Sequence, residues 1–198
     1  MLKKIALLSL ASISSFAMHS FEVNISDKDL GIYTQVDMGQ FVNTIRPDTT
    51  YLGFSFLNAD EDHSEGYNNK FKPFFELSFL KMKEISESDL SIGLGVKANY
   101  TAHYSALPLG AEIQYKLSNI SNVVPLSVKA SFYYAPEVLS LLDAREFLEI
   151  GCSVNIEVIQ NGSIKLGYRR IETNFEYSTY RLNALYNESM YFGYKFAF

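Results

Sequence analysis

The stretch that decides the fold closes the chain and reads MYFGYKFAF, residues 190–198. Large apolar side chains alternate in it with small or polar ones, and its single charge, Lys195, lies among the small residues. Strict alternation predicts a β-strand, because successive strand side chains point to opposite faces. A terminal aromatic strand is typical of the closing strand of a bacterial outer-membrane β-barrel. We expect the barrel-assembly machinery to read its aromatic face, which comprises Phe192, Tyr194, Phe196 and Phe198.

The same alternation recurs along the whole chain. The candidate strands are 21–25, 30–38, 52–56, 71–79, 90–100, 107–117, 126–134, 148–158, 164–169 and 190–198. Apart from 21–25, 52–56 and 164–169, which are shorter, they are about as long as a tilted strand must be to cross a bilayer, ~9–11 residues. The pattern therefore predicts an all-β fold, an antiparallel outer-membrane β-barrel of about ten strands, with eight strands as the alternative.

Charge falls on one strand face throughout, whereas the other face is almost entirely Leu, Ile, Val, Phe, Tyr and Ala. A soluble barrel would turn the apolar face inward. Three features favour the membrane arrangement instead: an exported chain without a disulfide, the terminal phenylalanine, and small residues beside the charges. The predicted lumen-lining residues are Glu22, Asp37, Lys72, Glu76, Lys97, Glu112, Lys116, Lys129, Glu149, Glu157, Lys165, Arg169 and Lys195.

Acids and bases nearly balance on this predicted inner face. In a small barrel they would pair, because unpaired charges away from bulk water are costly. The lumen is then either plugged by ion pairs or a narrow aqueous pore whose free charges set its selectivity. The sequence leaves both interpretations open.

The N-terminus predicts export. A basic start, MLKK, precedes a short apolar run and small residues at Ser15 and Ala17, the pattern of a signal peptide over residues 1–17, with cleavage after Ser20 as the alternative. The barrel domain then covers 21–198. Removal of Lys3 and Lys4 leaves 15 basic and 22 acidic residues, a net charge of −7, which argues against a nucleic-acid partner. One cysteine, Cys152, excludes an internal disulfide and a cysteine metal cluster, and we expect no cofactor.

The connections between strands alternate in length. The longer ones, expected outside the cell, are 58–70, 101–106, 135–144 with one helical turn, and 173–189. Short turns such as Gln160-Asn161-Gly162 are expected in the periplasm, and 39–49 is the exception, being long.

Aromatic side chains near the expected outer ends of strands predict an interfacial belt of Tyr100, Tyr134 and Phe175. Three loop tyrosines, Tyr177, Tyr180 and Tyr186, either bind a ligand or pack on one another over the barrel mouth. Arg170 has lipid-facing parity, as has Cys152. We expect Arg170 to lie near the outer interface, or a bulge to turn Ile171 toward lipid instead.

Two segments resemble the YfaZ family of small Gram-negative outer-membrane proteins. They are FYYAPEVL at 132–139 and GYRRIE at 167–172, and the likeness covers about residues 126–198. The resemblance implies an outer-membrane barrel of porin-like type. It implies no catalytic residues.

These features predict a small porin-like channel or a plugged structural barrel, embedded among outer-membrane lipid and lipopolysaccharide. The alternative is a surface-binding barrel that acts through loops 58–70 and 173–189. A third possibility is a hydrolase with a rim site, whose candidate residues are Asp60, Asp62, His63 and His103. Solvated loop residues explain that cluster equally well, so we predict no enzyme. The solute, partner and oligomeric state are not predictable from the sequence.

Overall fold

The computed structural model describes residues 19–59, 73–85, 88–101, 104–117, 125–142, 144–177 and 180–198. The predicted signal peptide, Lys72 and the four candidate rim residues of a hydrolase therefore lie outside the described residues.

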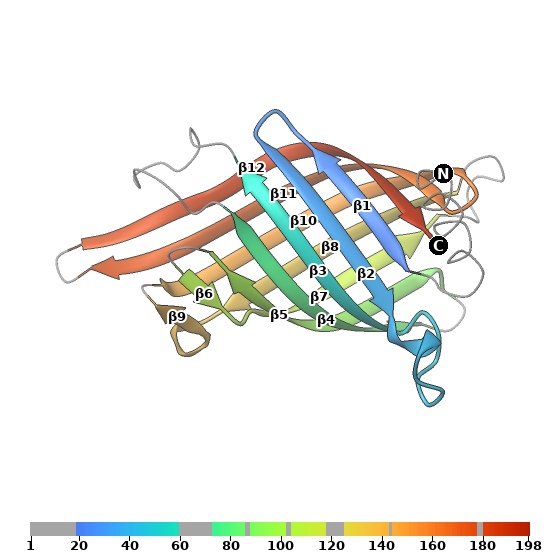
Figure 1. Cartoon of the computed structure of the whole chain (residues 1–198), viewed down its shortest axis with the longest axis horizontal. Helices are drawn as coiled ribbons and strands as arrows, with labels where there is room; N and C mark the ends of the chain where they lie inside the picture. Colours follow the sequence, from blue (N-terminus) through green and yellow to red (C-terminus); the bar gives the residue numbers. More distant parts are fainter. Residues whose placement is uncertain are drawn as a thin grey trace, which may run out of the picture.

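Ten antiparallel strands form one closed barrel (Figure 1). They are β1 (Ser20–Ile25), β2 (Asp29–Asp37), β3 (Thr50–Ala59), β4 (Phe74–Glu84), β5 (Leu90–Tyr100), β7 (Leu109–Lys116), β8 (Leu126–Ala135), β10 (Ala144–Ile159), β11 (Gly162–Tyr177) and β12 (Tyr180–Ala197). Each of these strands pairs with the next, and β12 pairs back with β1. The predicted ten-stranded barrel is confirmed, and the eight-stranded alternative is wrong.

Two short strands, β6 (Tyr104–Ala106) and β9 (Ser140–Leu142), lengthen one side of the wall. β6 continues the register of β7 along β5 across a break at Leu107 and Pro108. β9 continues β8 after a 3-10 turn, η3 (Glu137–Leu139), which confirms the predicted helical turn in 135–144. A second turn, η1 (Met38–Gln40), follows β2. The described helical turns include none that is long and apolar enough to span a membrane.

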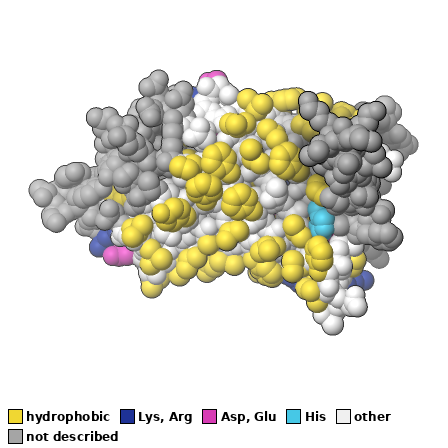
Figure 2. Space-filling model, viewed as in Figure 1, with side chains coloured by type: hydrophobic (Ala, Val, Ile, Leu, Met, Phe, Trp, Pro, Cys, Tyr) yellow, Lys and Arg dark blue, Asp and Glu magenta, His cyan; other side chains and the backbone are white. Residues whose placement is uncertain are grey.

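The exterior of the barrel is apolar, as Figure 2 shows for one side. Met190 is 76% exposed and Leu94 is 69% exposed, and both point away from the lumen. In the middle of the barrel the ionisable side chains point inward, and Glu22, Glu76, Lys97, Glu112 and Arg169 are buried. This polarity is the reverse of a soluble barrel, so the predicted membrane-type arrangement is confirmed.

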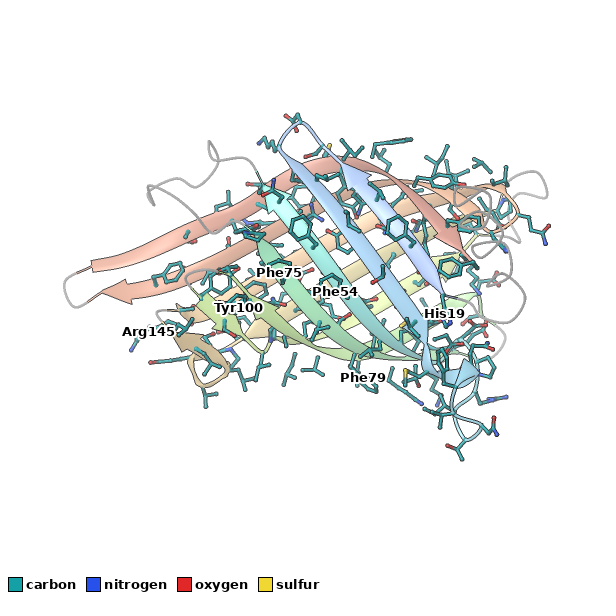
Figure 3. The ribbon with its side chains drawn as sticks, viewed as in Figure 1. His19, Phe54, Phe75, Phe79, Tyr100 and Arg145 are labelled. Carbon is teal, nitrogen blue, oxygen red and sulfur yellow. The ribbon has the colours of Figure 1, made fainter. Side chains whose placement is uncertain are left out.

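The two ends of the barrel differ. His19 and Phe198 lie at one end, here called the terminal end (Figures 1 and 3). At the opposite end, the hairpin end, β11 and β12 project beyond the other strands (Figure 1). The predicted loop 173–189 is therefore wrong: these residues belong mostly to two long paired strands.

A β-bulge in β12 explains why alternation did not reveal the longer strand. Ile171 pairs with Asn187, but Glu172 pairs with Leu185, so Tyr186 is an extra residue. Tyr186 and Asn187 are both buried on the inner face, which breaks the two-residue period. The bulge lies in the partner strand, and the prediction that Ile171 faces lipid is wrong, because Ile171 stays inward and buried.

An apolar cluster fills the lumen at the hairpin end, and we call it the mouth cluster. Its members are Leu57, Ala59, Phe74, Tyr104, Ala106, Ala135, Ala144, Phe147, Ile171, Phe175, Ala184 and Tyr186. Phe175, predicted to lie in the interfacial belt, is therefore an inner residue, and that prediction is wrong. Its strand runs further than expected, so its parity points into the lumen. Tyr100 and Tyr134 do face outward.

Glycines on the inner face make room for aromatic rings, and Gly110 lies against both a ring and a backbone carbonyl. A Cβ there would lie 2.2 Å from the backbone oxygen of Phe132 and 2.4 Å from the Tyr133 ring. We expect Gly110→Ala to destabilise the barrel by about 1–3 kcal/mol, because the backbone of β8 cannot move aside. Urea unfolding of the protein in lipid vesicles measures the effect.

Gly151→Ala is the matched control for this substitution. Gly151 is also an inward glycine, but its Cβ would meet the flexible Ser131 hydroxyl at 2.8 Å. Equal losses in the two variants would show that the contact with the Phe132 backbone has no special weight.

Candidate functional site

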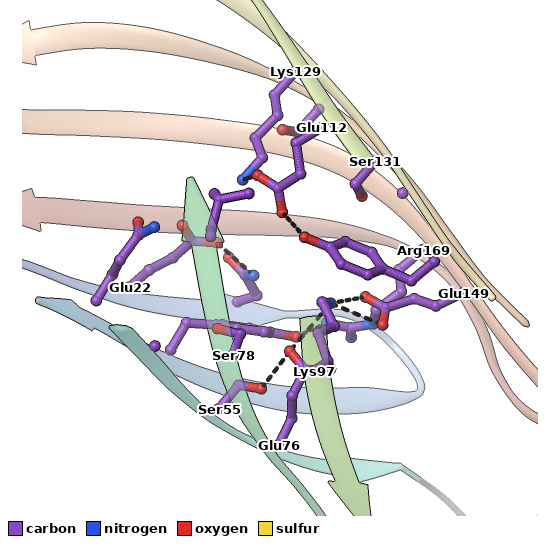
Figure 4. A pocket seen from close by; sticks show the side chains of 18 of the residues that line it. Glu22, Ser55, Glu76, Ser78, Lys97, Glu112, Lys129, Ser131, Glu149 and Arg169 are labelled. Atoms are coloured by element: carbon purple, nitrogen blue, oxygen red, sulfur yellow. Dashed lines mark hydrogen bonds and ion pairs between the residues drawn. The ribbon is translucent and has the colours of Figure 1, made fainter. Parts of the chain in front are cut away.

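The inward side chains of the middle of the barrel surround a cavity of about 160 Å³ (Figure 4). Of the thirteen predicted lumen-lining residues, eight line it: Glu22, Glu76, Lys97, Glu112, Lys129, Glu149, Lys165 and Arg169. They come from seven strands, because every strand presents alternate residues inward.

Lys97 of β5 is at the centre of the largest charge cluster. Its ammonium lies 2.7 Å from a Glu149 carboxylate oxygen and 3.1 Å from the Glu76 carboxylate (Figure 4). Glu76 also accepts a hydrogen bond of 3.3 Å from the Ser55 hydroxyl. One buried cation thus holds carboxylates from two distant strands, β4 and β10, and ties opposite parts of the wall together.

A second set of contacts extends from Lys97 toward β7 and β8. The Lys97 ammonium lies 4.1 Å from the centre of the Tyr133 ring, and the Tyr133 hydroxyl donates to Glu112 at 3.0 Å. Glu112 also forms an ion pair of 2.5 Å with Lys129. Lys97, Tyr133, Glu112 and Lys129 therefore form one continuous polar chain across the lumen (Figure 4).

Glu22 of β1 pairs with Lys165 of β11 across β12. The Lys165 ammonium lies 2.6 and 2.7 Å from the two Glu22 oxygens, and the Asn24 amide donates to Glu22 at 2.7 Å. This ion pair lies over the junction where the last strand meets the first.

Arg169 of β11 lies at the hairpin-end side of the cavity and reaches the start of β2. It donates to Asp29 at 2.7 Å, to the side-chain amide oxygen of Asn187 at 3.1 Å and to the Tyr33 hydroxyl. Asp29 also accepts hydrogen bonds from Asn187 at 2.7 Å and from the Ser189 hydroxyl. The Asp29 side chain is fully buried, so these donors compensate a carboxylate that has no access to water.

The charged groups that line the cavity balance, four carboxylates against four cations. Each of the eight has an ion-pair partner. Such a lumen presents no excess of either sign to a passing ion. Among the residues that the structure describes, no group of three or more His, Cys, Asp or Glu side chains could hold a metal ion.

Comparison with known proteins gives one family match. A family model described as "YfaZ precursor" matches residues 84–198, more than half of the chain. The chain belongs to the YfaZ family. Among solved structures, a KdgM porin aligns over 91% of this chain and 98% of its own length, with 8% identity and a TM-score of 0.45. No curated protein matches the chain.

Four predicted lumen residues of this YfaZ-family barrel lie away from the cavity. Lys116 and Glu157 are exposed near the terminal ends of β7 and β10, and Lys195 is half-buried near the end of β12. Asp37 is buried but accepts hydrogen bonds from the backbone N–H groups of Gly39 and Asp48, so it fixes the connection after β2. Burial and the nearby Asp37 carboxylate raise the pKa of Asp48 in that connection.

The predicted assembly residues lie at the closing seam. Phe192, Tyr194 and Phe196 point outward from β12, and the Phe198 ring stacks on Phe196 with ring centres 6.0 Å apart. Phe198 also exchanges two backbone hydrogen bonds with His19, of 2.9 and 2.8 Å. Recognition of these aromatic residues by the barrel-assembly machinery stays a prediction.

Several residues of the site were not singled out by the sequence analysis, among them Asp29, Tyr33 and Asn187. Asp29 follows Ser26-Asp27-Lys28 and resembles part of a polar turn, although its parity along β2 matches that of Asp37. Tyr33 has the same parity, but an inward tyrosine gives no sign of its partner. Asn187 has the inward parity of Ser189 and Tyr191, but it falls in residues 173–189, which the sequence analysis assigned to a loop.

We expect Asp29→Ala to destabilise the YfaZ-family barrel by about 3–5 kcal/mol, because Arg169 would keep its buried charge without its counterion. Urea unfolding in vesicles gives the loss. Asp27→Ala, an exposed carboxylate two residues earlier, should change stability by no more than about 0.5 kcal/mol. A loss of under about 1 kcal/mol for Asp29→Ala would mean that Asn187 and Ser189 hold the seam without it.

Proposed function

We propose that this protein is an outer-membrane barrel with a closed lumen, and that its resting state does not conduct ions. The observation that carries the proposal is the mouth cluster, in which Tyr104 and Phe147 are both 0% exposed. Ions cannot pass a packed apolar cross-section, because they would lose their hydration there without compensation.

The side chains of the mouth cluster fit one another closely, which supports a closed ground state. The Tyr104 ring centre lies 6.1 Å from those of Phe147 and Phe175, and Phe74 lies 5.3 Å from Tyr186. Five alanines, at 59, 106, 135, 144 and 184, line the same space. Small residues facing large rings let opposite walls approach until the interior is filled.

A narrow channel that opens by rearrangement is the second candidate. The observation in its favour is the cavity of about 160 Å³ in the middle of the barrel, which is large enough for several water molecules and is lined by four acids and four bases. Polar surface of this kind is what a permeating solute would meet once the mouth cluster opened.

The surface-binding alternative now depends on different residues. Loop 58–70 lies mostly outside the described residues, and 173–189 is largely strand. Deleting 173–189 would also remove Phe175 and Tyr186 from the mouth cluster, so loss of binding in that variant would not identify a binding loop. The proposal includes no catalytic activity. Its partners are outer-membrane lipid, lipopolysaccharide and, during insertion, the barrel-assembly machinery.

Conductance in a planar bilayer tests the closed lumen. We expect the wild-type protein to show no discrete steps, because the mouth cluster blocks the lumen. The double variant Tyr104→Ser, Phe147→Ser should show discrete steps, because two buried rings are replaced by small polar side chains. Heat-modifiable gel mobility verifies that each preparation is folded.

The matched control is Phe132→Ser, Tyr134→Ser, which makes similar changes on the outer face of β8. It should stay silent. Discrete steps in the wild type, with an ion selectivity that changes in Lys97→Glu, Lys129→Glu, would refute the closed lumen and establish an open pore.

Selectivity of the opened variant tests the role of the charged cavity. Adding Lys97→Glu to Tyr104→Ser, Phe147→Ser should shift the reversal potential toward cation selectivity, because the cavity would hold five carboxylates and three cations in place of four of each. Lys116→Glu, an exposed lysine of β7, is the control and should leave the reversal potential nearly unchanged. Equal shifts in both variants would show that ions do not pass the cavity.

A further inference from the structure

Four exposed apolar side chains form a patch at the hairpin end, and we call it the rim patch. Its members are Leu107, Val138, Leu141 and Leu142. Val138 is 81% exposed, more than any other large apolar residue that the structure describes, and Leu142 is 69% exposed. The patch lies on η3, β9 and the β6–β7 junction, which are joined by a 2.8 Å hydrogen bond from the Leu107 N–H to the Leu139 carbonyl.

The rim patch continues the apolar exterior of the barrel. Leu107 is two residues before Leu109 and shares its outward face, and Leu109 pairs with Tyr134 of β8. Leu141 of β9 lies opposite Ser105, the next outward residue of β6 beyond Leu107. From the middle of β7 to the tip of β9 the outer face is therefore mostly apolar.

The neighbouring sector of the hairpin end has the opposite character. Its outward residues on β10, β11 and β12 include Glu146, Arg170, Glu172 and Glu188. Arg170 pairs with Glu172 at 2.7 Å, and the Tyr168 hydroxyl donates to Glu188 at 2.7 Å. The apolar exterior therefore extends less far toward the hairpin end on β11 and β12 than it does on β6 and β9.

Local geometry maintains the exposure of the rim patch. The 3-10 turn η3 interrupts the β8–β9 strand and leaves Val138 exposed. Leu142 has a φ of 64°, a conformation that leucine rarely adopts and that Gly or Asn would usually supply at such a turn. The Glu137–Arg145 pair, at 3.1 Å, lies beside the patch, with Arg145 at the hairpin end in Figure 3.

We propose that the rim patch contacts lipid acyl chains, so that the bilayer rises further along β6 and β9 than along β11 and β12. The barrel is then tilted in the membrane, or the membrane thickens beside β9. The occupant is lipid because the patch is continuous with the lipid-facing exterior. The inference rests on the membrane placement in the proposed function.

The chain has no tryptophan, so each single substitution to tryptophan introduces one tryptophan, whose emission has no background from others. The test uses the full mature protein, refolded into vesicles of phosphatidylcholine with or without brominated acyl chains. Leu141→Trp reports on the rim patch and Leu94→Trp on the middle of the exterior. Asn183→Trp is the polar-sector control, on the exposed outer face of β12.

We expect Leu141→Trp to emit at short wavelength and to be quenched by brominated lipid nearly as strongly as Leu94→Trp. Asn183→Trp should emit at long wavelength without quenching. Long-wavelength, unquenched emission from Leu141→Trp would overturn the proposal by placing the patch in water. Short-wavelength emission without quenching would overturn it in favour of a protein contact, such as a second copy. Loss of quenching in Leu94→Trp as well would refute the membrane placement itself.

Discussion

The backbone hydrogen bonds between β1 and β12 close the sheet, and every other feature of the molecule depends on that closure. β1 pairs with β12 over only six residues, from Ser20 opposite Ala197 to Ile25 opposite Phe192. His19 and Phe198 extend the pairing at the terminal end, where the Phe41 ring stacks on His19 at 5.4 Å. In a bilayer an unpaired strand edge has no water to satisfy it, so these few pairs make the fold possible.

The shortness of β1 leaves a gap that side chains fill. Beyond Phe192, β12 runs on toward the hairpin end with no described strand beside it on the β1 side. There Asp29 receives hydrogen bonds from β11 and β12 across the gap, and Tyr186 donates to the Leu57 carbonyl at 3.2 Å. The two walls are thus joined by a buried carboxylate and a tyrosine in place of a backbone ladder. This explains the position of Arg169, because its positive charge offsets the desolvation cost of burying the Asp29 carboxylate.

Alternation predicted the membrane-spanning part well, because there the physics is uniform. Lipid outside and a polar lumen inside impose a two-residue period, and a slip of one residue would move lysines and glutamates into lipid. The strands, their inner faces and eight cavity residues could therefore be read from the sequence. The partners of those residues could not, since Lys97 and Glu149 are 52 positions apart and only the closed barrel brings them together.

Prediction failed for β11 and β12 at the hairpin end because the polarity of these two strands inverts there. In the middle of the barrel, Leu166 faces outward and Lys165 inward, as lipid requires. Six residues further along β11, Glu172 faces outward and Ile171 inward, the arrangement of a soluble sheet. Residues 173–189 resembled a loop because the rule that identified the other strands no longer applied, and the bulge at Tyr186 shifted the period as well.

This inversion separates the two roles of the interior. Buried ion pairs are seldom the most stable filling for a space, and well-packed apolar side chains often do as well. The lumen nevertheless keeps four ion-paired bases and four acids in the middle of the barrel and concentrates its apolar packing at the mouth. If both faces of the membrane-spanning strands were apolar, nothing would specify which face points to lipid. Charged residues on one face specify that this face points into the lumen. At the mouth the outward residues of β11 and β12 are polar, and apolar packing fills the interior. The charges therefore specify which face turns inward, and the mouth cluster closes the lumen in the resting state that we propose.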